Sequence, residues 1–345
     1  MSNPFTVSFG KSPLEEIERP TQINEIIDVF SAQPIDRQIY IITGIRGSGK
    51  TVMMSSVAKR FKAEEDWIVV ELNPETDMLR GLAAKLCSES ACSEIFRRAK
   101  LNLSLLGFGI EISGEPPISD IESALDRMLE SLKKKGKRVL VTVDEATNNS
   151  NVRIFAAAFQ IFVRHELPLF LLMTGLYENI EDLQDEKSLT FLYRAPKIHL
   201  KPLNMFAIAS RYRSLFHLDE SDARKMASVT KGYPFAFQVL GYLTWRGNCG
   251  YDDILPLYRQ YLEEYVYDKI WSELSAKDRE AVIAIAKSGT GKVSDILLRL
   301  DSTAGKFSPY RDRLIKKGIV SDGTRGYLSF TLPLFGEYAI DKDEI

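Results

Sequence analysis

Short apolar runs alternate with segments of helical periodicity along the chain up to residue 203. The runs are Ile39–Ile42, Trp67–Leu72, Val139–Val143, Leu169–Met173 and a weaker one at Ile198–Leu200. Strands that are apolar on both faces are typical of a parallel sheet with helices on both sides. The pattern therefore predicts an α/β domain over residues 1–203.

The segments between these runs carry helix and turn signals of their own. Residues Gln22–Phe30 repeat apolar positions at helical spacing. Ser119 and Glu122 form a capping box in front of a second amphipathic helix, which predicts the helix N-terminus there. Leu101–Ser113 alternates apolar and polar residues around two glycines, which predicts a β-hairpin inserted into the α/β domain.

Beyond residue 203 the strand signal disappears. Residues 207–270 have helical periodicity throughout, which predicts a helical lid domain over residues 204–272. Three further helices and an alternating strand follow, at Ser275–Lys287, Val293–Leu300, Ser308–Lys317 and Tyr327–Thr331. Three helices followed by a hairpin outline a winged helix, so we predict a winged-helix domain over residues 273–345.

Composition restricts the function more than it restricts the fold. The chain has 345 residues, of which 45% are hydrophobic and 27% charged, as in packed soluble proteins. Its net charge of −2 does not indicate permanent binding to nucleic acid, so any basic surface must be local. Its cysteines, Cys87, Cys92 and Cys249, and its histidines have no metal-ligand spacing and form no recognisable nucleophilic triad. We expect reduced thiols.

The chain shows no signal for export or membrane insertion. Residues 1–10 lack the basic start and apolar run of a signal peptide. No apolar stretch approaches the roughly 20 residues that a membrane-spanning helix needs. We therefore expect a cytoplasmic protein without membrane contacts.

One glycine-rich segment carries the strongest chemical signal. Residues 44–51 match the P-loop pattern and lie between an apolar run and a predicted helix that starts at Thr51. Glycines let the backbone fold around a phosphate with N–H groups pointing inward, and the helix presents its positive end there. We expect Lys50 to reach the β- and γ-phosphates and Thr51 to bind Mg²⁺. The predicted nucleotide contacts are Gly44, Ile45, Arg46, Gly47, Ser48, Gly49, Lys50, Thr51 and Val52.

A pair of acids supports the same site independently. The apolar run Val139–Val143 leads directly into Asp144 and Glu145. Isolated carboxylates at the end of a buried strand are costly unless a cation is present. In P-loop proteins the first acid holds the Mg²⁺ shell, and an adjacent glutamate can act as general base on the attacking water. We therefore predict Asp144 as the metal residue and Glu145 as the base.

Two further residues are candidates for catalysis. Thr174 ends the run Leu169–Met173, where a polar side chain would lie beside the γ-phosphate and sense hydrolysis; the alternative is an ordinary strand-ending threonine. Arg194 precedes the last apolar run, where an arginine finger could reach the nucleotide of a neighbouring subunit. A solvated surface arginine is the alternative for Arg194.

Together these motifs resemble the AAA+/STAND side of the P-loop ATPases, especially the archaeal-type ATPases and their bacterial relatives. The resemblance covers nearly the whole chain and rests on Asn3–Gly10, Arg19, the P-loop, Asp144-Glu145, Thr230–Pro234, Tyr310–Leu314 and Phe330–Phe335. It implies that the nucleotide is ATP or ADP with Mg²⁺. It also implies that Pro234, in the family's Gly-x-Pro element, packs near the nucleotide base.

The chain departs from the AAA+ pattern at two places. Glu18 replaces the glycine of the family's Gly-Arg pair, and Tyr233-Pro234-Phe235 stands where many AAA+ proteins carry a sensing arginine. The second departure makes the chain resemble the STAND switches, in which the ADP-bound lid and winged helix hold the protein closed until a trigger arrives. The resemblance thus implies a protein trigger as partner, and it leaves open whether the chain forms a nucleotide-dependent homo-oligomer or stays a monomer.

The predicted helix Ser308–Lys317 is basic in an otherwise acidic chain. Its cations, Arg311, Arg313, Lys316 and Lys317, could contact duplex DNA if the helix entered a major groove. Its apolar positions must also bury against the two preceding helices, so an intramolecular lid or protein-docking role is the alternative.

Three functions follow from these signals. The first is a Mg²⁺-dependent, ATP-hydrolysing conformational switch. The second is a DNA-binding initiator or regulator that nucleotide controls, and the third is a nucleotide-loaded protein scaffold with little turnover. The first is our principal hypothesis, and the other two are its alternatives, because related ATPase folds serve different functions.

Overall fold

The computed structural model describes residues 2–8, 13–247 and 251–344, and the chain divides into two compact units. One, the sheet unit, comprises Arg19–Thr43 and Lys50–His199. The other, the C-terminal unit, comprises Met1–Glu18, Gly44–Gly49 and Leu200–Ile345. Phe9 and Gly10 of the opening motif, and Cys249, lie outside the described residues.

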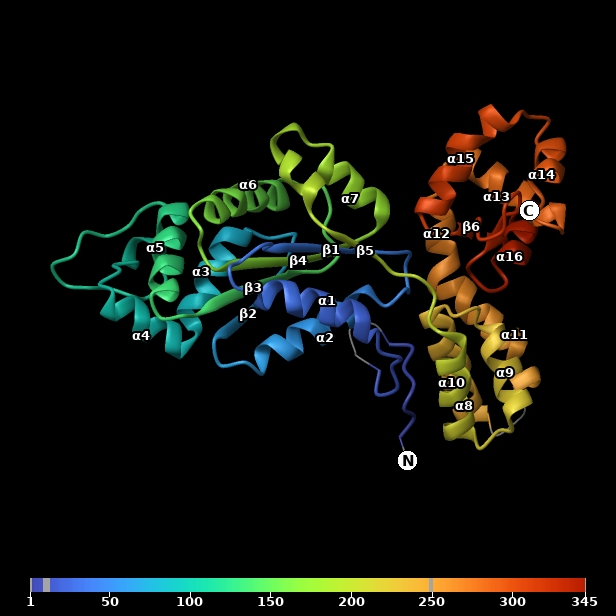
Figure 1. Ribbon diagram of the computed structural model, residues 1–345, viewed down its shortest axis with the longest axis horizontal. Helices are drawn as coiled ribbons and strands as arrows, with labels where there is room; N and C mark the ends of the chain where they lie inside the picture. Colours follow the sequence, from blue (N-terminus) through green and yellow to red (C-terminus); the bar gives the residue numbers. More distant parts are fainter. Residues whose placement is uncertain (1, 9–12, 248–250, 345) are drawn as a thin grey trace. The chain divides into compact units, whose positions relative to one another are not determined.

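The sheet unit is built on a five-stranded parallel sheet in the order β2-β3-β4-β1-β5. Its strands are β1 (Ile39–Thr43), β2 (Trp67–Leu72), β3 (Arg138–Val143), β4 (Leu169–Gly175) and β5 (Lys197–His199). All five apolar runs form strands, so the predicted α/β class and parallel sheet are confirmed. Helices cover both faces, with α6 and α7 on one side and α1 and α2 on the other (Figure 1).

The helices of this unit connect successive strands. They are α1 (Pro20–Ser31), α2 (Lys50–Lys62), α3 (Met78–Ser88), α4 (Ser90–Arg98), α5 (Ile121–Lys133), α6 (Ser150–Arg164) and α7 (Tyr177–Gln184), with the 3₁₀ turns η1 (Ser104–Leu106) and η2 (Lys187–Arg194). The middle of β3 is fully buried by them, as a two-sided parallel sheet requires. Helix α2 begins at Lys50, one residue before its predicted start.

The strand register brings three strand ends to one edge of the sheet. Ile42 of β1 lies opposite Thr174 of β4, and Val143 of β3 lies opposite Met173 of the same strand. Because the strands are parallel, the segment after each of them leaves from that edge. The residue that follows β3, Asp144, therefore lies beside the end of β4.

The predicted hairpin at residues 101–113 is wrong. The described segment holds the turn η1 and no strand. The Asn102 side chain organises it instead, donating to the carbonyls of Ile112 at 3.3 Å and Glu115 at 2.9 Å and accepting from the Ser104 hydroxyl at 2.7 Å. A buried asparagine satisfies these carbonyls in place of a strand ladder, so alternating apolar residues here indicate a packed loop.

The predicted N-cap of α5 is also wrong by one residue. Asp120, not Ser119, caps the helix, with its carboxylate accepting from the Ser123 N–H at 2.7 Å. A carboxylate accepts this bond more strongly than a hydroxyl and complements the positive helix end. The same bond lowers the pKa of Asp120.

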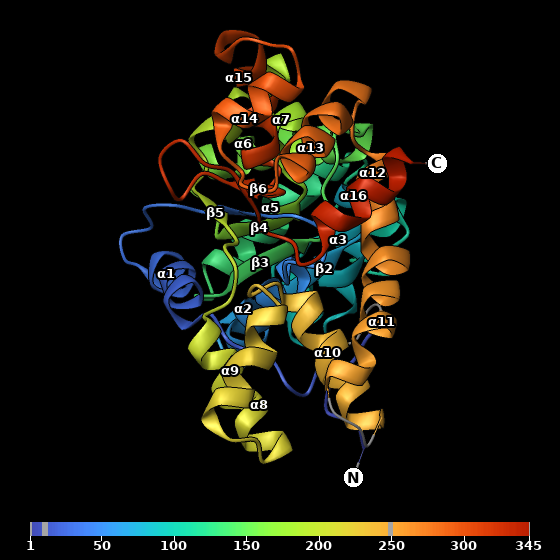
Figure 2. The same cartoon turned by 90° about the vertical axis from the view of Figure 1, so that its right-hand side faces the viewer.

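The C-terminal unit is mostly helical (Figure 2). Its elements are α8 (Met205–Phe216), α9 (Glu220–Val229), α10 (Pro234–Gly247), α11 (Tyr251–Leu262), the π-helical turn η3 (Glu263–Tyr267), α12 (Asp268–Ser272), α13 (Ala276–Ser288), α14 (Val293–Arg299), α15 (Ala304–Lys316), β6 (Val320–Ser321), β7 (Ser329–Phe330) and α16 (Phe335–Asp343). Ser275 caps α13 as predicted, accepting from the Asp278 N–H at 3.1 Å. Helix α15 begins earlier than predicted, at Ala304, and the predicted strand Tyr327–Thr331 is reduced to β7.

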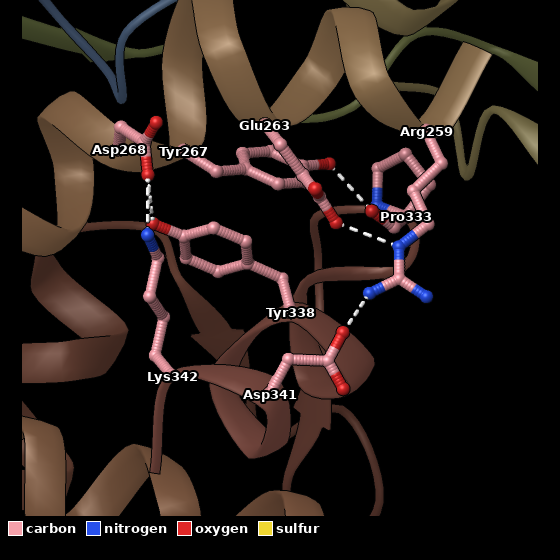
Figure 3. A network of polar contacts seen from close by, with 8 residues as sticks. All are labelled: Arg259, Glu263, Tyr267, Asp268, Pro333, Tyr338, Asp341 and Lys342. Carbon is pink, nitrogen blue, oxygen red and sulfur yellow. Dashed lines mark hydrogen bonds and ion pairs between the residues drawn. The ribbon is translucent and has the colours of Figure 1, made fainter. Parts of the chain in front are cut away.

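A polar network binds α16 to the helices that precede α13 (Figure 3). Arg259 of α11 forms ion pairs with Glu263 at 2.6 Å and with Asp341 of α16. Asp268 of α12 accepts a hydrogen bond from the Tyr338 hydroxyl of α16 at 2.7 Å. These contacts join the predicted lid and winged-helix segments through side chains.

Within the described ranges, no helix combines the length and apolar character needed to cross a bilayer.

Candidate nucleotide-binding site

The glycine-rich loop joins the end of β1 to the first residue of α2. Gly47 and Gly49 have φ of +71° and +86°, in the left-handed region that glycine enters at little cost. The close approach of Tyr233 to the loop also requires glycine at position 47, since a Cβ there would lie 2.2 Å from the Tyr233 hydroxyl oxygen. The Ser48 N–H donates to the Ile45 carbonyl at 3.2 Å and closes the turn. This backbone has the tight curvature that the sequence predicts for a phosphate-binding loop.

The donor groups along the loop and the start of α2 fit a phosphate. The Ser48 side chain is 4% exposed, and its Oγ is buried without a hydrogen-bond partner among the described residues. Lys50, the first residue of α2, is largely buried. A buried hydroxyl without a partner needs a ligand to satisfy it, and helix N-termini attract anions. The residues present therefore suit a nucleotide's phosphate oxygens.

Asp144 lies at the centre of a cluster of oxygen groups. The Thr51 hydroxyl donates to Asp144 Oδ2 at 2.7 Å, and the Thr174 hydroxyl donates to Asp144 Oδ1. Three residues predicted from separate segments thus meet at one point. A carboxylate and a threonine hydroxyl are hard oxygen ligands of the kind that Mg²⁺ binds together with water and phosphate. The cluster therefore fits the predicted metal.

Glu145 adopts a backbone conformation that is unfavourable for a non-glycine residue. Its φ is +52°, and its N–H donates to Asp144 Oδ1 and to Thr174 Oγ1, each at 3.1 Å. Strained backbone of this kind persists where surrounding contacts enforce it, often at functional sites. The Glu145 side chain is exposed, so a water molecule can reach its carboxylate.

The remaining predicted residues lie on other elements. Val52 is partly buried in the first turn of α2, and Arg194 is exposed at the end of η2, outside the hydrogen-bonded cluster around Asp144. Pro234 is the first residue of α10, and its Cβ lies 3.9 Å from the position of a Cβ built on Gly49. The Gly-x-Pro element is therefore beside the glycine-rich loop.

Sequence reasoning missed the contacts that the rest of the C-terminal unit makes with this loop. The Tyr233 hydroxyl donates to the Arg46 carbonyl at 2.6 Å, and the Phe235 N–H donates to the Gly47 carbonyl at 3.2 Å. The Arg46 guanidinium forms two bonds to the Glu273 carboxylate, at 2.6 and 3.2 Å. The sequence marks Tyr233 as part of the Gly-x-Pro element and of the departure from the AAA+ pattern, but neither predicts its contact with the loop, and no local pattern marks Glu273.

Electrostatics favours the charged form of Glu273. Burial alone would raise the pKa of its carboxyl, but the hydrogen bonds and positive charges of Arg46 and Lys269 outweigh it, and the pKa is lowered. Burial also raises the pKa of Tyr233, and because it outweighs the opposing positive charge of Arg46, that pKa lies well above the ordinary value. The Tyr233 hydroxyl thus stays protonated and remains a donor at neutral pH.

A histidine that the motifs did not single out borders the start of the loop. The Thr43 hydroxyl, at the end of β1, lies 2.6 Å from Nδ1 of His199, at the end of β5. Partial burial and the charge of Lys197 lower the pKa of His199. The imidazole is therefore neutral at pH 7, where one ring nitrogen can accept the threonine's hydrogen.

The basic helix α15 is engaged in ion pairs within its own unit. Arg313 makes a bidentate contact with Asp278 of α13, with Nη2 2.7 Å from Oδ1 and Nε 3.0 Å from Oδ2. Arg311 lies 2.9 Å from Asp322. Asp278 is almost completely buried, so Arg313 compensates a buried charge and thereby supports the packing of α15 on α13.

Two families match parts of the chain. Residues 17–168 match a family described as an ATPase domain predominantly from Archaea. This range contains the glycine-rich loop and both acids, Asp144 and Glu145. Residues 264–339 match a family described as a domain of unknown function (DUF8462). The second match begins within η3 and ends within α16. None of the curated proteins matches the chain.

Solved structures resemble the chain along nearly its whole length. A Walker-type ATPase of Pyrococcus abyssi is 18% identical, with a TM-score of 0.61 over 93% of this chain and 95% of its own. The Aeropyrum pernix ORC2 protein, solved in ADPNP-ADP complexes, is 14% identical, with a TM-score of 0.59 over 97% of this chain and 95% of its own. At such low identity these similarities establish the fold.

Proposed function

Because the chain carries an archaeal-type P-loop ATPase domain, we propose that it is a Mg²⁺-dependent, ATP-hydrolysing conformational switch. In this proposal, nucleotide binds at the glycine-rich loop, and the C-terminal unit changes its packing with the state of that nucleotide. The bound nucleotide is ATP before hydrolysis and ADP after it.

The proposed chemistry uses the residues around Asp144. Lys50 and the loop N–H groups hold the phosphates, while Thr51 and Asp144 hold Mg²⁺, which neutralises charge on the phosphate oxygens when bound. Thr174 keeps the Asp144 carboxylate in place through its hydroxyl. Glu145, exposed beside them, accepts a proton from the attacking water. Arg194 is assigned to a neighbouring subunit's nucleotide in a homo-oligomer, which its exposure permits.

The observation that carries the switch is the ion pair between Arg46 and Glu273. Arg46 belongs to the glycine-rich loop, and Glu273 lies between α12 and α13. Both side chains are about 70% buried, with exposed fractions of 30% and 27%, so the pair is better protected from solvent than an ordinary surface pair. A loop that rearranges around a γ-phosphate must shift or break this pair, and the segment before α13 then senses the nucleotide.

Steady-state ATP hydrolysis by the purified chain tests the enzymatic part. We expect turnover that requires Mg²⁺ and disappears in Lys50→Ala, while Lys59→Ala, an exposed lysine on the same helix, retains it. Equal turnover in wild type and Lys50→Ala would contradict the assignment. Tightly bound ADP with no turnover would instead favour the nucleotide-loaded scaffold, with a protein trigger needed to release it.

Duplex DNA binding by α15 is the second candidate function. Four cations on or beside this helix favour it, namely Arg311, Arg313, Lys316 and Lys317. The pairing of Arg313 with Asp278 and of Arg311 with Asp322 weakens it, because DNA would have to compete with these carboxylates.

Salt-dependent binding of a duplex to the full chain tests this second candidate. Lys316→Gln/Lys317→Gln is the informative variant, since it leaves both arginine pairs in place. Loss of binding in that variant supports DNA contact by α15, and stimulation of ATP hydrolysis by the duplex would join the two functions.

A further inference from the structure

We infer that Tyr233 is a positioning residue of the glycine-rich loop. Its hydroxyl fixes the orientation of the Arg46–Gly47 peptide and so directs the Gly47 N–H toward the bound phosphates. The inference deepens the proposed function and rests on nucleotide binding at this loop. Tyr233 itself touches no phosphate in this assignment. It acts through the loop backbone.

Tyr233 constrains the geometry of one peptide group in the glycine-rich loop. Tyr233 is 3% exposed, and its hydroxyl donates to the Arg46 carbonyl oxygen at 2.6 Å. A trans peptide is planar, so its carbonyl and its N–H point in opposite directions. Holding the Arg46 carbonyl toward Tyr233 therefore turns the Gly47 N–H away from Tyr233. Loss of the hydroxyl removes this restraint on rotation of the peptide through the flanking dihedral angles.

The next peptide of the loop is constrained in the same way. The Gly47 carbonyl accepts from the Phe235 N–H at 3.2 Å, which turns the Ser48 N–H away from the start of α10. This approach requires glycine at position 47, because a Cβ there would lie only 2.9 Å from the Phe235 Cβ. Two consecutive loop peptides are thus held by residues around the start of α10. Both carbonyls face the holding residues.

The Tyr233 hydroxyl differs from an ordinary buried hydroxyl in where its acceptor lies. Buried tyrosine hydroxyls need acceptors, and two other buried tyrosines find theirs within the helices around them. Tyr258 donates to the Val229 carbonyl at 3.2 Å, and Tyr212 donates to the Phe237 carbonyl at 2.8 Å. Tyr233 differs because its acceptor lies 187 residues away in the sequence, inside the glycine-rich loop. Burial keeps all three hydroxyls protonated by raising their pKa.

Removing one hydroxyl at a time tests the inference. Tyr233→Phe and Tyr258→Phe each delete a hydroxyl that donates to a carbonyl, but only the first deletes one that binds the loop. Binding of ADP to the full chain is measured by titration calorimetry with Mg²⁺ present, and circular dichroism checks that both variants are folded. We expect the Kd for ADP to rise about tenfold in Tyr233→Phe, the effect of one lost hydrogen bond, and to stay within about twofold of wild type in Tyr258→Phe.

The possible results separate this inference from the proposed function. If wild type does not bind ADP, the proposed function fails and the inference fails with it. If wild type binds ADP and Tyr233→Phe binds it equally well, only the positioning role is overturned. An equal loss in both variants also overturns it, because the effect would then come from weakened packing. The melting temperatures of the nucleotide-free variants identify that case.

Discussion

The Thr51 hydroxyl donates a hydrogen bond to Asp144 Oδ2 over 2.7 Å, joining the first turn of α2 to the end of β3. One residue belongs to the glycine-rich motif and the other to the acidic motif, 93 residues further along the chain. The parallel register explains their meeting, since both segments leave the same edge of the sheet. This contact makes Asp144 the natural first target for substitution.

Asp144→Asn should remove Mg²⁺-dependent hydrolysis. The amide keeps the shape and can still accept from Thr51, but it lacks the charge that holds a divalent cation. We expect kcat to fall at least about 100-fold, the scale of losing one charged group in a preorganised site. Steady-state ATP hydrolysis across a range of Mg²⁺ concentrations measures it. Asp185→Asn, at the end of α7, serves as the control and should leave kcat unchanged.

Glu145→Gln should stop turnover and leave nucleotide binding intact. Loss of a general base costs about 10²- to 10⁴-fold in rate. Glu166→Gln is a matched control, because Glu166 is also exposed and has a φ of +55°, close to the +52° of Glu145. Single-turnover hydrolysis and ADP affinity are measured for both variants. Turnover by Glu145→Gln at the rate of wild type would assign the base elsewhere.

Gly47→Ala should destabilise the loop more than its backbone angle alone requires. Gly109 has a φ of +70°, almost equal to the +71° of Gly47, but a Cβ at Gly109 meets no atom within 4 Å. Gly109→Ala therefore reports the left-handed strain alone, about 1–2 kcal/mol. Gly47→Ala adds the clash with Tyr233, so its free energy of unfolding in urea should fall by at least a further 1 kcal/mol or so. Equal losses in the two variants would exclude the clash.

The Arg46–Glu273 pair should give the stability of the chain a defined pH dependence. The folded-state pKa of Glu273 is lowered, so the unfolded state binds a proton more readily. The stabilisation is then complete above the pKa of Glu273 in the unfolded state, which is about 4.5. It is lost as the pH falls through the lower pKa of Glu273 in the folded state. We expect Glu273→Gln to lower the free energy of unfolding at pH 7 by about 1–2 kcal/mol and by less at pH 3.

Urea unfolding at several pH values between 7 and 3 measures this difference. Glu264→Gln, whose carboxylate accepts a bond from Gln260, provides the control for losing an acid on the same run of helices. A constant difference between wild type and Glu273→Gln over that range would show that the pair does not titrate as described.

The sheet and the Asp144 cluster could be predicted from the sequence because their signals are local. Strands buried on both faces give apolar runs, and Gly47 and Gly49 mark backbone that only glycine adopts easily. The acids after β3 needed only one further rule, that parallel strands end at one edge. The pairing of Asp144 with Thr174 follows from the same rule.

The contacts of Tyr233 and Glu273 could not be predicted in that way. Their partners in the loop lie 187 and 227 residues away, and no periodicity records which helix packs beside the loop. The hairpin prediction for the region around Asn102 was wrong for a related reason. Several of its apolar residues, among them Leu103 and Ile110, are buried in a loop that one side-chain amide holds, and a packed loop can imitate a strand pattern.

Hydrogen exchange of the segment from Glu273 through α13 tests the central claim most directly. The full chain is compared in two states, with Mg²⁺ and ADP and with Mg²⁺ and a non-hydrolysable ATP analogue. If nucleotide state is transmitted through Arg46, amides at the start of α13 exchange at different rates in the two states, and the difference disappears in Glu273→Gln. Identical exchange in the two states of the wild-type chain would contradict the switch, even if the chain hydrolyses ATP.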